Sequence, residues 1–579
     1  MRKTGTADVR STRRRFLIGS AALATPWWLA GCARRDTADL LLLNGEIHTV
    51  DAANRRVEAL AVRGNRVLAA GSVAELKTLA GPATRVIDLG GRTVLPGIND
   101  SHLHLLGWGL AQPPFAVDVT YPNVTSIADC VDVVRQAAAT RPAGEWITGR
   151  GWDQPYLSEG RPPTAADLDA VAPDHPVALT EFSGHAIWAN SRALALAGIT
   201  ADTEPPPGGV IVKDGTGQPT GLLFEGAAWM LRDQIPPPGT GQRKAALKNA
   251  MAAMLRRGIT SATEPGQSPE NLAIYNELAG EAFAAKMRIT GLVAAGSSTE
   301  SLQEAMAGMA GMESANPAFL SLPGVKIMGD GIPTANRTAW LNEPYNGGGN
   351  GSLLIDGTSH DERVAELNRM IRIIHEAGQQ IGTHMTGDRS IDTAVAAYLA
   401  AQQAKPREDP RHYIIHADLV SPTALATMAT AGIGANFNPE IKHLIADSQV
   451  YSLGRERAAY EWPYRSALDA GVVVASSSDA PVTEGNWLQG LATCVDRRGK
   501  QTGNVSGPEQ RISLDEAIRT YTAAGAWQDH AETVKGSLEP GKVADLCVLE
   551  ERLSELPTED FAGVQVAMTL VDGTIVHEA

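Results

Sequence analysis

Short apolar runs that alternate with helix-like stretches are the feature that most restricts the fold of this 579-residue chain. Segments rich in Ala, Leu, Glu and Arg, such as 243–257 and 361–377, lie between most of these runs. The strand-like runs are 94–99, 259–264, 288–294, 325–328, 380–384, 412–416, 432–437 and 472–476. Strands that alternate with helices form parallel sheets, so these repeated units predict an α/β fold, a (β/α)8 TIM barrel. An open doubly wound sheet is the alternative, but no glycine-rich phosphate loop follows the first run.

Both ends of the chain show a different pattern, in which short alternating strands are separated by turn residues such as Asn44-Gly45 and Asp572-Gly573. We expect residues 38–92 and 530–579 to form one small composite β-sandwich domain beside a barrel domain at 93–529. The segment 107–240 lies between the first two barrel strands and is too long for a loop. It predicts an inserted subdomain or lid after strand 1.

Residues 1–31 have the pattern of an export signal. Arginines at 13–15 precede an apolar stretch at 16–30, which is shorter than the roughly 20 residues that span a bilayer. The stretch resembles a twin-arginine signal, with an ordinary secretory signal or a buried helix as alternatives. Leu29-Ala30-Gly31-Cys32 resembles a bacterial lipobox, in which Cys32 receives the lipid, whereas the alternative is a soluble protein cleaved nearby. We therefore expect a periplasmic or cell-envelope lipoprotein that meets the membrane only through its N-terminal lipid.

The charge balance limits the possible partners. The chain has 50 basic and 65 acidic residues, a formal net charge of −15, and no long run of Lys and Arg. This composition argues against a nucleic-acid partner. The 4 cysteines are too few for a disulfide framework in a chain of this length. A small-molecule substrate is the partner that the sequence predicts.

Polar residues gather where the predicted barrel strands end. His102 and His104 follow the first strand, and alternation along an extended segment points both to the same side, so they can share a metal ion. Further candidates lie in or after the fourth, fifth, sixth and eighth strands: Lys326, His384, His416 and Asp479. Barrel active sites lie at the carboxyl ends of the strands. The sequence therefore predicts a divalent-metal site, with zinc as the default and manganese, iron or cobalt also compatible.

An ordered set of motifs extends this interpretation. The chain resembles the amidohydrolase superfamily, specifically its amidohydrolase-3 branch of YtcJ-like and N-substituted formamide deformylase-like proteins. The motifs are 42–47, 94–104, 184–191, 219–223, 325–328, 384–389, 411–416, 478–481 and 536–546. The resemblance covers about residues 39–579. It implies a metal-dependent hydrolase that acts on a non-peptide carbon–nitrogen bond in an amide, formamide or cyclic amide.

The resemblance also implies the ligands and their roles. One or two divalent metals would be held by two ligand sets, which are His102, His104 and Asp479 on one side and His384 and His416 on the other. Lys326 would bridge the metals as a carboxylated lysine, and Asp479 would also be the catalytic acid and base. The alternative for Lys326 is a pairing with an acid such as Asp330, which would favour a mononuclear site. Relatives often pair, so a homodimer is possible.

Substrate contacts are predicted from position alone, at His185, Glu264, Asp330, Arg337 and His443. His185, Arg337 or His443 could stabilise an oxyanion. His185 is equally compatible with packing inside the inserted subdomain, and Glu264 with a simple salt bridge.

Three stretches depart from the family pattern and bear on the substrate rather than on the metal. They are Met385 after His384, residues 329–337, and residues 436–439. The same site could instead hydrolyse esters, lactones or phosphoesters, or act as a deaminase. A catalytically degenerate barrel that serves as a solute-binding lipoprotein is the alternative of another class, but every expected ligand is present.

Overall fold

The computed structural model describes residues 37–579 apart from 122, 183, 207–208, 284 and 335–336. The predicted signal at 1–31 and the predicted lipid attachment at Cys32 lie outside the described residues, so both stay predictions. Among the helices of the described part, none has the length and apolar character needed to cross a membrane.

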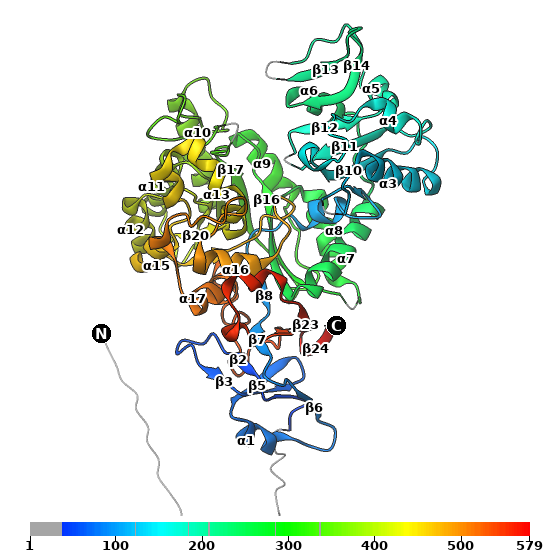
Figure 1. Ribbon diagram of the computed structural model, residues 1–579. Coiled ribbons are helices and arrows are strands. Elements are labelled where there is room, and N and C mark those ends of the chain that lie inside the picture. The colour runs from blue at the N-terminus through cyan, green and yellow to red at the C-terminus, as the bar shows by residue number, and fades with distance from the viewer. Residues whose placement is uncertain (1–36, 122, 183, 207–208, 284, 335–336) are drawn as a thin grey trace, which may run out of the picture.

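An eight-stranded parallel sheet forms the centre of the molecule (Figure 1). Its strands are β8 (Ile98–Asp100), β15 (Ile259–Gln267), β16 (Arg288–Ala294), β17 (Leu320–Met328), β18 (Gln380–Met385), β19 (Tyr413–His416), β20 (Gly434–Phe437) and β21 (Val474–Ser476). Neighbours pair in this order without exception, and every pairing is parallel. The predicted TIM barrel is confirmed.

The seam between β8 and β21 nearly closes the barrel. The Asp479 amide donates to the His102 carbonyl at 2.9 Å, and the Ser101 amide donates to the Ser476 carbonyl at 3.4 Å. The Asp100 carboxylate accepts from the Ser478 amide at 3.0 Å and from the Ser478 hydroxyl at 2.5 Å. The seam therefore holds the two segments that carry His102 and Asp479 side by side.

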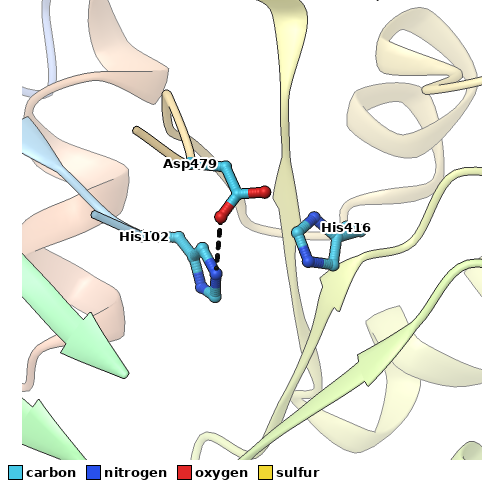
Figure 2. Close-up of side chains that lie close together, drawn as sticks. All are labelled: His102, His416 and Asp479. Carbon is cyan, nitrogen blue, oxygen red and sulfur yellow. Dashed lines mark ion pairs between the residues drawn. The ribbon is translucent and has the colours of Figure 1, made fainter. Parts of the chain in front are cut away.

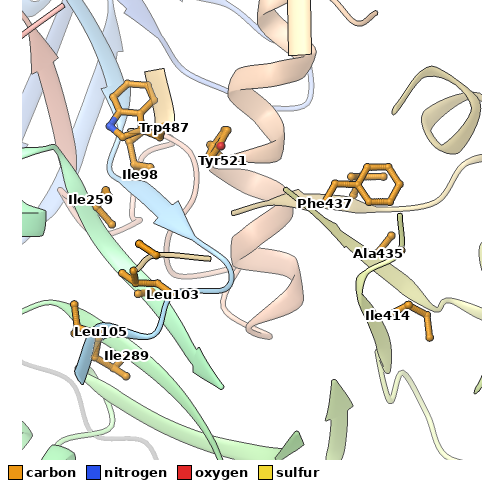
Figure 3. Close-up of a cluster of buried hydrophobic side chains, with 14 of the residues drawn as sticks. Ile98, Leu103, Leu105, Ile259, Ile289, Ile414, Ala435, Phe437, Trp487 and Tyr521 are labelled. Carbon is orange, nitrogen blue, oxygen red and sulfur yellow. The ribbon is translucent and has the colours of Figure 1, made fainter. Parts of the chain in front are cut away.

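Helices cover the outside of the barrel and pack on its strands. They are α2 (Leu105–Leu110), α7 (Thr240–Arg256), α8 (Pro269–Gly280), α9 (Thr299–Gly308), α10 (His360–Glu376), α11 (Asp388–Ala404), α12 (Pro422–Ala431), α13 (Pro439–Leu453), α14 (Arg455–Tyr460), α15 (Tyr464–Ala470), α16 (Trp487–Asp496), α17 (Leu514–Thr520) and α18 (Ala523–Gln528). Serine side chains cap several of these helices, as Ser268 does for α8 and Ser421 for α12. Figure 3 shows part of the core, in which Ile98, Ile259 and Phe437 are fully buried. Burial of each such side chain contributes about 1.5–3 kcal/mol.

Strands from both ends of the chain share one sheet below the barrel (Figure 1). This sheet contains β2 (Glu46–His48), β3 (Arg56–Val57), β7 (Thr93–Pro96), β22 (Leu546–Leu549), β23 (Val566–Val571) and β24 (Thr574–Glu578). A second sheet contains β1 (Leu40–Leu43), β4 (Ala59–Arg63), β5 (Arg66–Gly71) and β6 (Arg85–Asp88), with the short helix α1 (Val73–Leu76) beside it. The N- and C-terminal parts meet where β22 pairs antiparallel with β7, with Val548 opposite Val94.

The first predicted barrel strand, 94–99, is in fact two strands. β7 belongs to the terminal sheet and β8 to the barrel, and the chain changes sheet at Pro96-Gly97. Gly97 is needed here because an added Cβ would lie 2.1 Å from Oγ1 of Thr260. The apolar run continues through the break, so its pattern alone does not reveal the change of sheet.

The segment after β8 forms a separate α/β unit beyond the opposite end of the barrel from the terminal sheets (Figure 1). Its strands are β9 (Val117–Asp118), β10 (Ile147–Trp152), β11 (Val177–Glu181), β12 (Ala186–Ala189), β13 (Val210–Lys213) and β14 (Pro219–Phe224). Its helices are α3 (Ile127–Thr140), α4 (Ala165–Asp169), α5 (Ser191–Leu196) and α6 (Gly226–Arg232). The unit has its own core, in which Trp152 and Trp188 meet edge to face with ring centroids 6.1 Å apart.

Two buried histidines on the barrel wall form a hydrogen-bonded chain whose protons can be assigned. The Ile381 amide donates to Nδ1 of His412 at 3.1 Å, so the hydrogen of His412 sits on Nε2. That nitrogen donates to Nδ1 of His375 at 2.8 Å, and Nε2 of His375 donates to the Lys405 carbonyl at 2.8 Å. Both rings are neutral in this arrangement. Burial, followed by the neighbouring His375, lowers the pKa of His412 to about 3.

We expect this pair to make the fold acid-sensitive. Because the pKa of His412 is lower in the folded than in the unfolded state, its contribution is complete above pH ~6.5 and is lost as the pH falls towards 3. Between about pH 7 and pH 4.5 the loss is about 2 kcal/mol. The thermal unfolding midpoint should fall between pH 7 and pH 4.5, and this fall should be smaller for His412→Gln than for the unsubstituted protein. An equal fall in both proteins would contradict the assignment.

Candidate metal centre

The predicted ligands converge at the carboxyl ends of the barrel strands. His384 lies in β18 and His416 ends β19, whereas His102 and His104 follow β8 and Asp479 follows β21. His416 and Asp479 have φ values of +69° and +59°, a region that residues other than glycine seldom adopt. Such strain persists only where the surrounding structure imposes it, and it directs both side chains into the cluster.

Asp479 lies close to His102 and His416, and Figure 2 marks its ion pair with His102. Its Oδ1 is 3.2 Å from Nε2 of His102 and 3.4 Å from Nε2 of His104. The ring of His416 lies with its centroid 5.1 Å from that of His102 and 4.3 Å from that of His384. The donor atoms of His102, His416 and Asp479 all lie within 4.8 Å of one another. This group mixes the two predicted ligand sets, so the distances do not separate them as the resemblance implied.

The donors fit a divalent cation. His102 is 1% exposed, and its Nδ1 has no hydrogen-bond partner among the described residues, whereas its Nε2 lies 3.2 Å from Oδ1 of Asp479. An unsatisfied buried polar atom costs about 1–3 kcal/mol, so such an atom calls for an explanation. Two imidazoles and a carboxylate are the donor types that zinc and similar ions take. A cation between them would give one ring nitrogen of His102 a partner.

The protonation states also suit metal binding. Burial, followed by the charge of Lys326, lowers the pKa of His102 well below its usual value and that of His384 to about 3. These imidazoles are therefore neutral, as coordination requires. Burial alone would raise the pKa of Asp479, but hydrogen bonds from His102 and His104 hold it well below its usual value. Asp479 is a carboxylate at neutral pH.

Lys326 lies beside this cluster and is only 5% exposed. Burial lowers its pKa to about 7, against the opposing charge of Asp479. Its Nζ makes no hydrogen bond or ion pair within the described ranges of the chain. At neutral pH, a large fraction of the protein molecules therefore carry Lys326 as an uncharged amine.

The hydrogen bonds of Asp330 do not include Lys326, the partner that the alternative for that lysine assigned to it. Its carboxylate does not pair with Lys326, because it accepts from the Trp340, Thr386 and Gly387 amides at 2.9–3.0 Å and from the Ser390 hydroxyl at 2.5 Å. The residue is 0% exposed, and its predicted contact with substrate stays a prediction. Asp330 instead holds the turns that follow β17 and β18 together.

Glu264 also has partners among its neighbouring residues. It is 0% exposed, and Oε2 accepts from the Leu105 amide at 2.5 Å and from the Tyr275 hydroxyl at 2.6 Å. Its Oε1 accepts from the amide of Gln267, and the nearby His104 interacts with it electrostatically, so its predicted contact with substrate stays a prediction. Because His104 is the N-cap residue of α2, the Glu264 carboxylate positions the backbone that carries His104.

Asn438 is a functional residue that the sequence reasoning did not single out. Its Oδ1 lies 2.7 Å from Nδ1 of His416, and its Nδ2 donates to Oγ of Ser477 at 2.9 Å. A proton on Nδ1 of His416 leaves Nε2 free for a metal. Such outer partners fix the tautomer and orientation of a ligand. In the sequence, the departure from the common family pattern at 436–439 was the feature that could have pointed to Asn438.

We expect Asn438→Ala to weaken metal binding about 10- to 100-fold, because His416 loses the partner that fixes its tautomer. Titration of the metal-free protein with Zn²⁺, followed by calorimetry, measures the effect. Asn276→Ala removes a half-buried amide on α8 that bonds, among the described residues, only to Glu313 and Ala315, and this variant should bind Zn²⁺ as the unsubstituted protein does. Unchanged affinity in Asn438→Ala would show that His416 needs no such partner.

The remaining predicted contacts lie away from the cluster. His185 is in the inserted subdomain, with Nδ1 3.1 Å from Oε2 of Glu225. Nδ1 of His443 lies 2.9 Å from the Arg498 carbonyl, and Arg337 lies beside Gly347. None of the three makes a hydrogen bond or ion pair with the ligand cluster in the described part of the chain. Their roles towards substrate stay predictions.

An eight-stranded barrel with histidine and carboxylate donors gathered at its carboxyl end is the architecture of a metal-dependent hydrolase. Comparison with known proteins gives the family. A model described as "Amidohydrolase family" matches residues 85–577, and the chain belongs to this family.

Individual relatives agree with this assignment. The chain is 29% identical over 549 residues to the putative amidohydrolase YtcJ of Bacillus subtilis (strain 168), covering 92% of this chain and 98% of the relative. It is 28% identical over 549 residues to N-substituted formamide deformylase of Arthrobacter pascens, covering 93% and 98%. A crystal structure of a metal-dependent hydrolase from Pyrococcus furiosus superposes with a TM-score of 0.70 at 27% identity, covering 88% and 99%. The protein is thus a hydrolase that uses a divalent metal.

Proposed function

We propose that the protein hydrolyses a non-peptide carbon–nitrogen bond in an amide, a formamide or a cyclic amide. The observation that carries the proposal is Asp479, a buried carboxylate held ionised by two imidazoles at the carboxyl end of the barrel. The similarity to N-substituted formamide deformylase supports the carbon–nitrogen bond as the target.

His102, His416 and Asp479 would hold the first metal, and His104, His384 and a carboxylated Lys326 would complete a second position. A bound divalent cation supplies Lewis acidity, which polarises a carbonyl group and lowers the pKa of water. Zinc is the default for imidazole and carboxylate donors, with manganese, iron or cobalt also suitable.

The side chain of Lys326 has the protonation state that carboxylation needs. An uncharged amine attacks carbon dioxide, so that a nitrogen–carbon bond forms, a proton leaves and the lysine ends in a carboxylate. The lowered pKa of Lys326 provides this amine at neutral pH. In the carboxylated product, an anionic oxygen ligand would take the place of the buried ammonium group of Lys326.

Asp479 supplies the proton transfers. Its ionised carboxylate accepts a proton from the attacking water and later delivers it to the leaving nitrogen. His102 and His104 hold Oδ1 in place through both transfers. The seam contact between the Asp479 amide and the His102 carbonyl keeps this geometry rigid.

A substrate panel tests the proposal. N-formyl amines, simple amides and cyclic amides are compared with esters and lactones of the same carbon skeleton, and amine release is measured directly. We expect the nitrogen compounds to have the higher kcat/KM by about tenfold or more. A preference for esters or lactones would overturn the proposal, and Asp479→Ala controls for background hydrolysis.

We also propose that residues 1–31 export the chain and that Cys32 anchors it through a lipid, on the strength of the arginine run and the lipobox. Arg13→Lys combined with Arg14→Lys should leave precursor in the cytoplasm, as judged by fractionation. Normal secretion of that variant would indicate the ordinary secretory route.

A further inference from the structure

The inserted subdomain contains a cavity of about 490 Å³ whose lining residues all belong to that subdomain. Its wall includes Trp152 and Phe224 as aromatic side chains, and Asp153, Glu181 and His185 as titratable ones. The metal centre uses none of these residues. The cavity is therefore a feature that the proposed chemistry does not explain.

The cavity lies where several strands of the inserted sheet end. Trp152 ends β10, Glu181 ends β11 and Phe224 ends β14. β10 and β11 are parallel, and β14 runs in the same direction as β11 because two antiparallel pairings through β12 separate them. Ligands of open α/β sheets bind outside the carboxyl ends of the strands. The cavity occupies that position in the inserted sheet.

The lining carries more acid than base. Asp153 and Glu181 contribute two carboxylates, whereas His185 faces a third, Glu225, at 3.1 Å. Burial, followed by the charge of Glu181, raises the pKa of Asp153, which places the two carboxylates within electrostatic reach of each other. Arg150 interacts with Glu181 but does not line the cavity.

The aromatic side chains complete a surface suited to an organic cation. Phe224 is the half-buried aromatic side chain of the lining, whereas Trp152 is 2% exposed and packs in the core of the subdomain, where its Nε1–H donates to the Leu179 carbonyl at 2.8 Å. Aromatic rings attract ammonium groups by about 0.5–2 kcal/mol, and they also pack against the apolar part of the ligand. Exposed rings of Tyr156 and Phe182 follow the same strand ends, at 54% and 45% exposure.

One charged residue of this sheet edge, Arg150, lies near a segment of the barrel domain. Arg150 lies in β10, two residues before Trp152, and interacts with Glu484. Glu484 belongs to the segment that follows Asp479. The edge of the cavity thus lies near the segment that follows Asp479 in the sequence.

From this lining we propose that the cavity binds an organic cation, an aryl- or alkylammonium group held between Asp153 and Glu181. The proposal also extends to catalysis, and this second part rests on the proposed function. The cavity selects substrates that carry an ammonium group remote from the bond that is cleaved.

Binding is tested first on the full chain, without any reaction. Calorimetry compares phenethylammonium with 2-phenylethanol, which has the same ring and chain but no charge. We expect the ammonium to bind about tenfold or more tightly than the alcohol, and Asp153→Asn or Glu181→Gln to weaken it about fivefold or more. Asp132→Asn removes an exposed carboxylate on α3 and should change nothing. Equal binding of the two probes to the unsubstituted protein, a comparison that needs no variant, would overturn the proposal.

Catalysis is tested with two N-formyl phenethylamines that differ only in a para substituent, aminomethyl against hydroxymethyl. The aminomethyl compound should have the lower KM, and Glu181→Gln should remove the difference. If neither compound is hydrolysed while the ammonium probe still binds through Asp153 and Glu181, the proposed function fails and the cation site stands. If both are hydrolysed with the same KM, and the two probes bind equally, the cation site fails and the proposed function stands.

Discussion

Asp479→Asn should reduce kcat/KM for the best amide substrate about 10³-fold or more. The asparagine amide has nearly the same size as the carboxylate, but it cannot accept a proton and offers a neutral ligand. It also loses the charge that now pairs with His102 and His104. The measurement is steady-state kinetics on protein loaded with metal.

Two controls make the result interpretable. Asp469→Asn removes an exposed carboxylate on α15 and should retain full activity. Asp479→Asn should keep the overall fold, because its backbone contact to the His102 carbonyl does not depend on the side chain. Activity within about threefold of the unsubstituted protein would remove Asp479 from the mechanism.

Lys326→Met should lower activity about 10²- to 10³-fold. Methionine fills the same buried space, yet it can neither react with carbon dioxide nor become an anionic ligand. If the lysine acts as a carboxylate, added formate or acetate should restore part of the activity of a smaller variant, Lys326→Ala. Rates measured over a range of acid concentrations test this rescue.

The matched control is Lys77→Met, which replaces an exposed lysine of the terminal domain. It should behave as the unsubstituted protein, with or without added acid. Full activity in Lys326→Met would show that an uncharged, non-ligating side chain suffices at this position, so a carboxylated Lys326 would not be a required metal ligand.

The barrel could be predicted because its signal is repeated and long. Strands such as 288–294 coincide with the observed β16, since an apolar run bounded by turns marks a buried parallel strand. β6 at Arg85–Asp88 was not predicted, because its side chains are mostly exposed and its apolar pattern is weak. The change of sheet at Pro96-Gly97 depends on a contact with Thr260, which lies more than 150 residues away in the sequence.

The ligand cluster followed from the same logic, since histidines at strand ends must meet at one end of the barrel. Two other carboxylates have partners that the sequence does not reveal. Glu264 and Asp330 stand at strand ends like the ligands, but their carboxylates turn to backbone amides instead of the pocket. Residue type and position do not determine that choice, because it depends on which amides the neighbouring turns leave unpaired.

The metal content of the purified protein tests the central claim most directly. Elemental mass spectrometry should find about one or two divalent ions per chain, and His102→Ala and Asp479→Ala should each lower this content severalfold. Less than about a tenth of an ion per chain in the unsubstituted protein, after purification without chelators, would contradict a metal-dependent hydrolase.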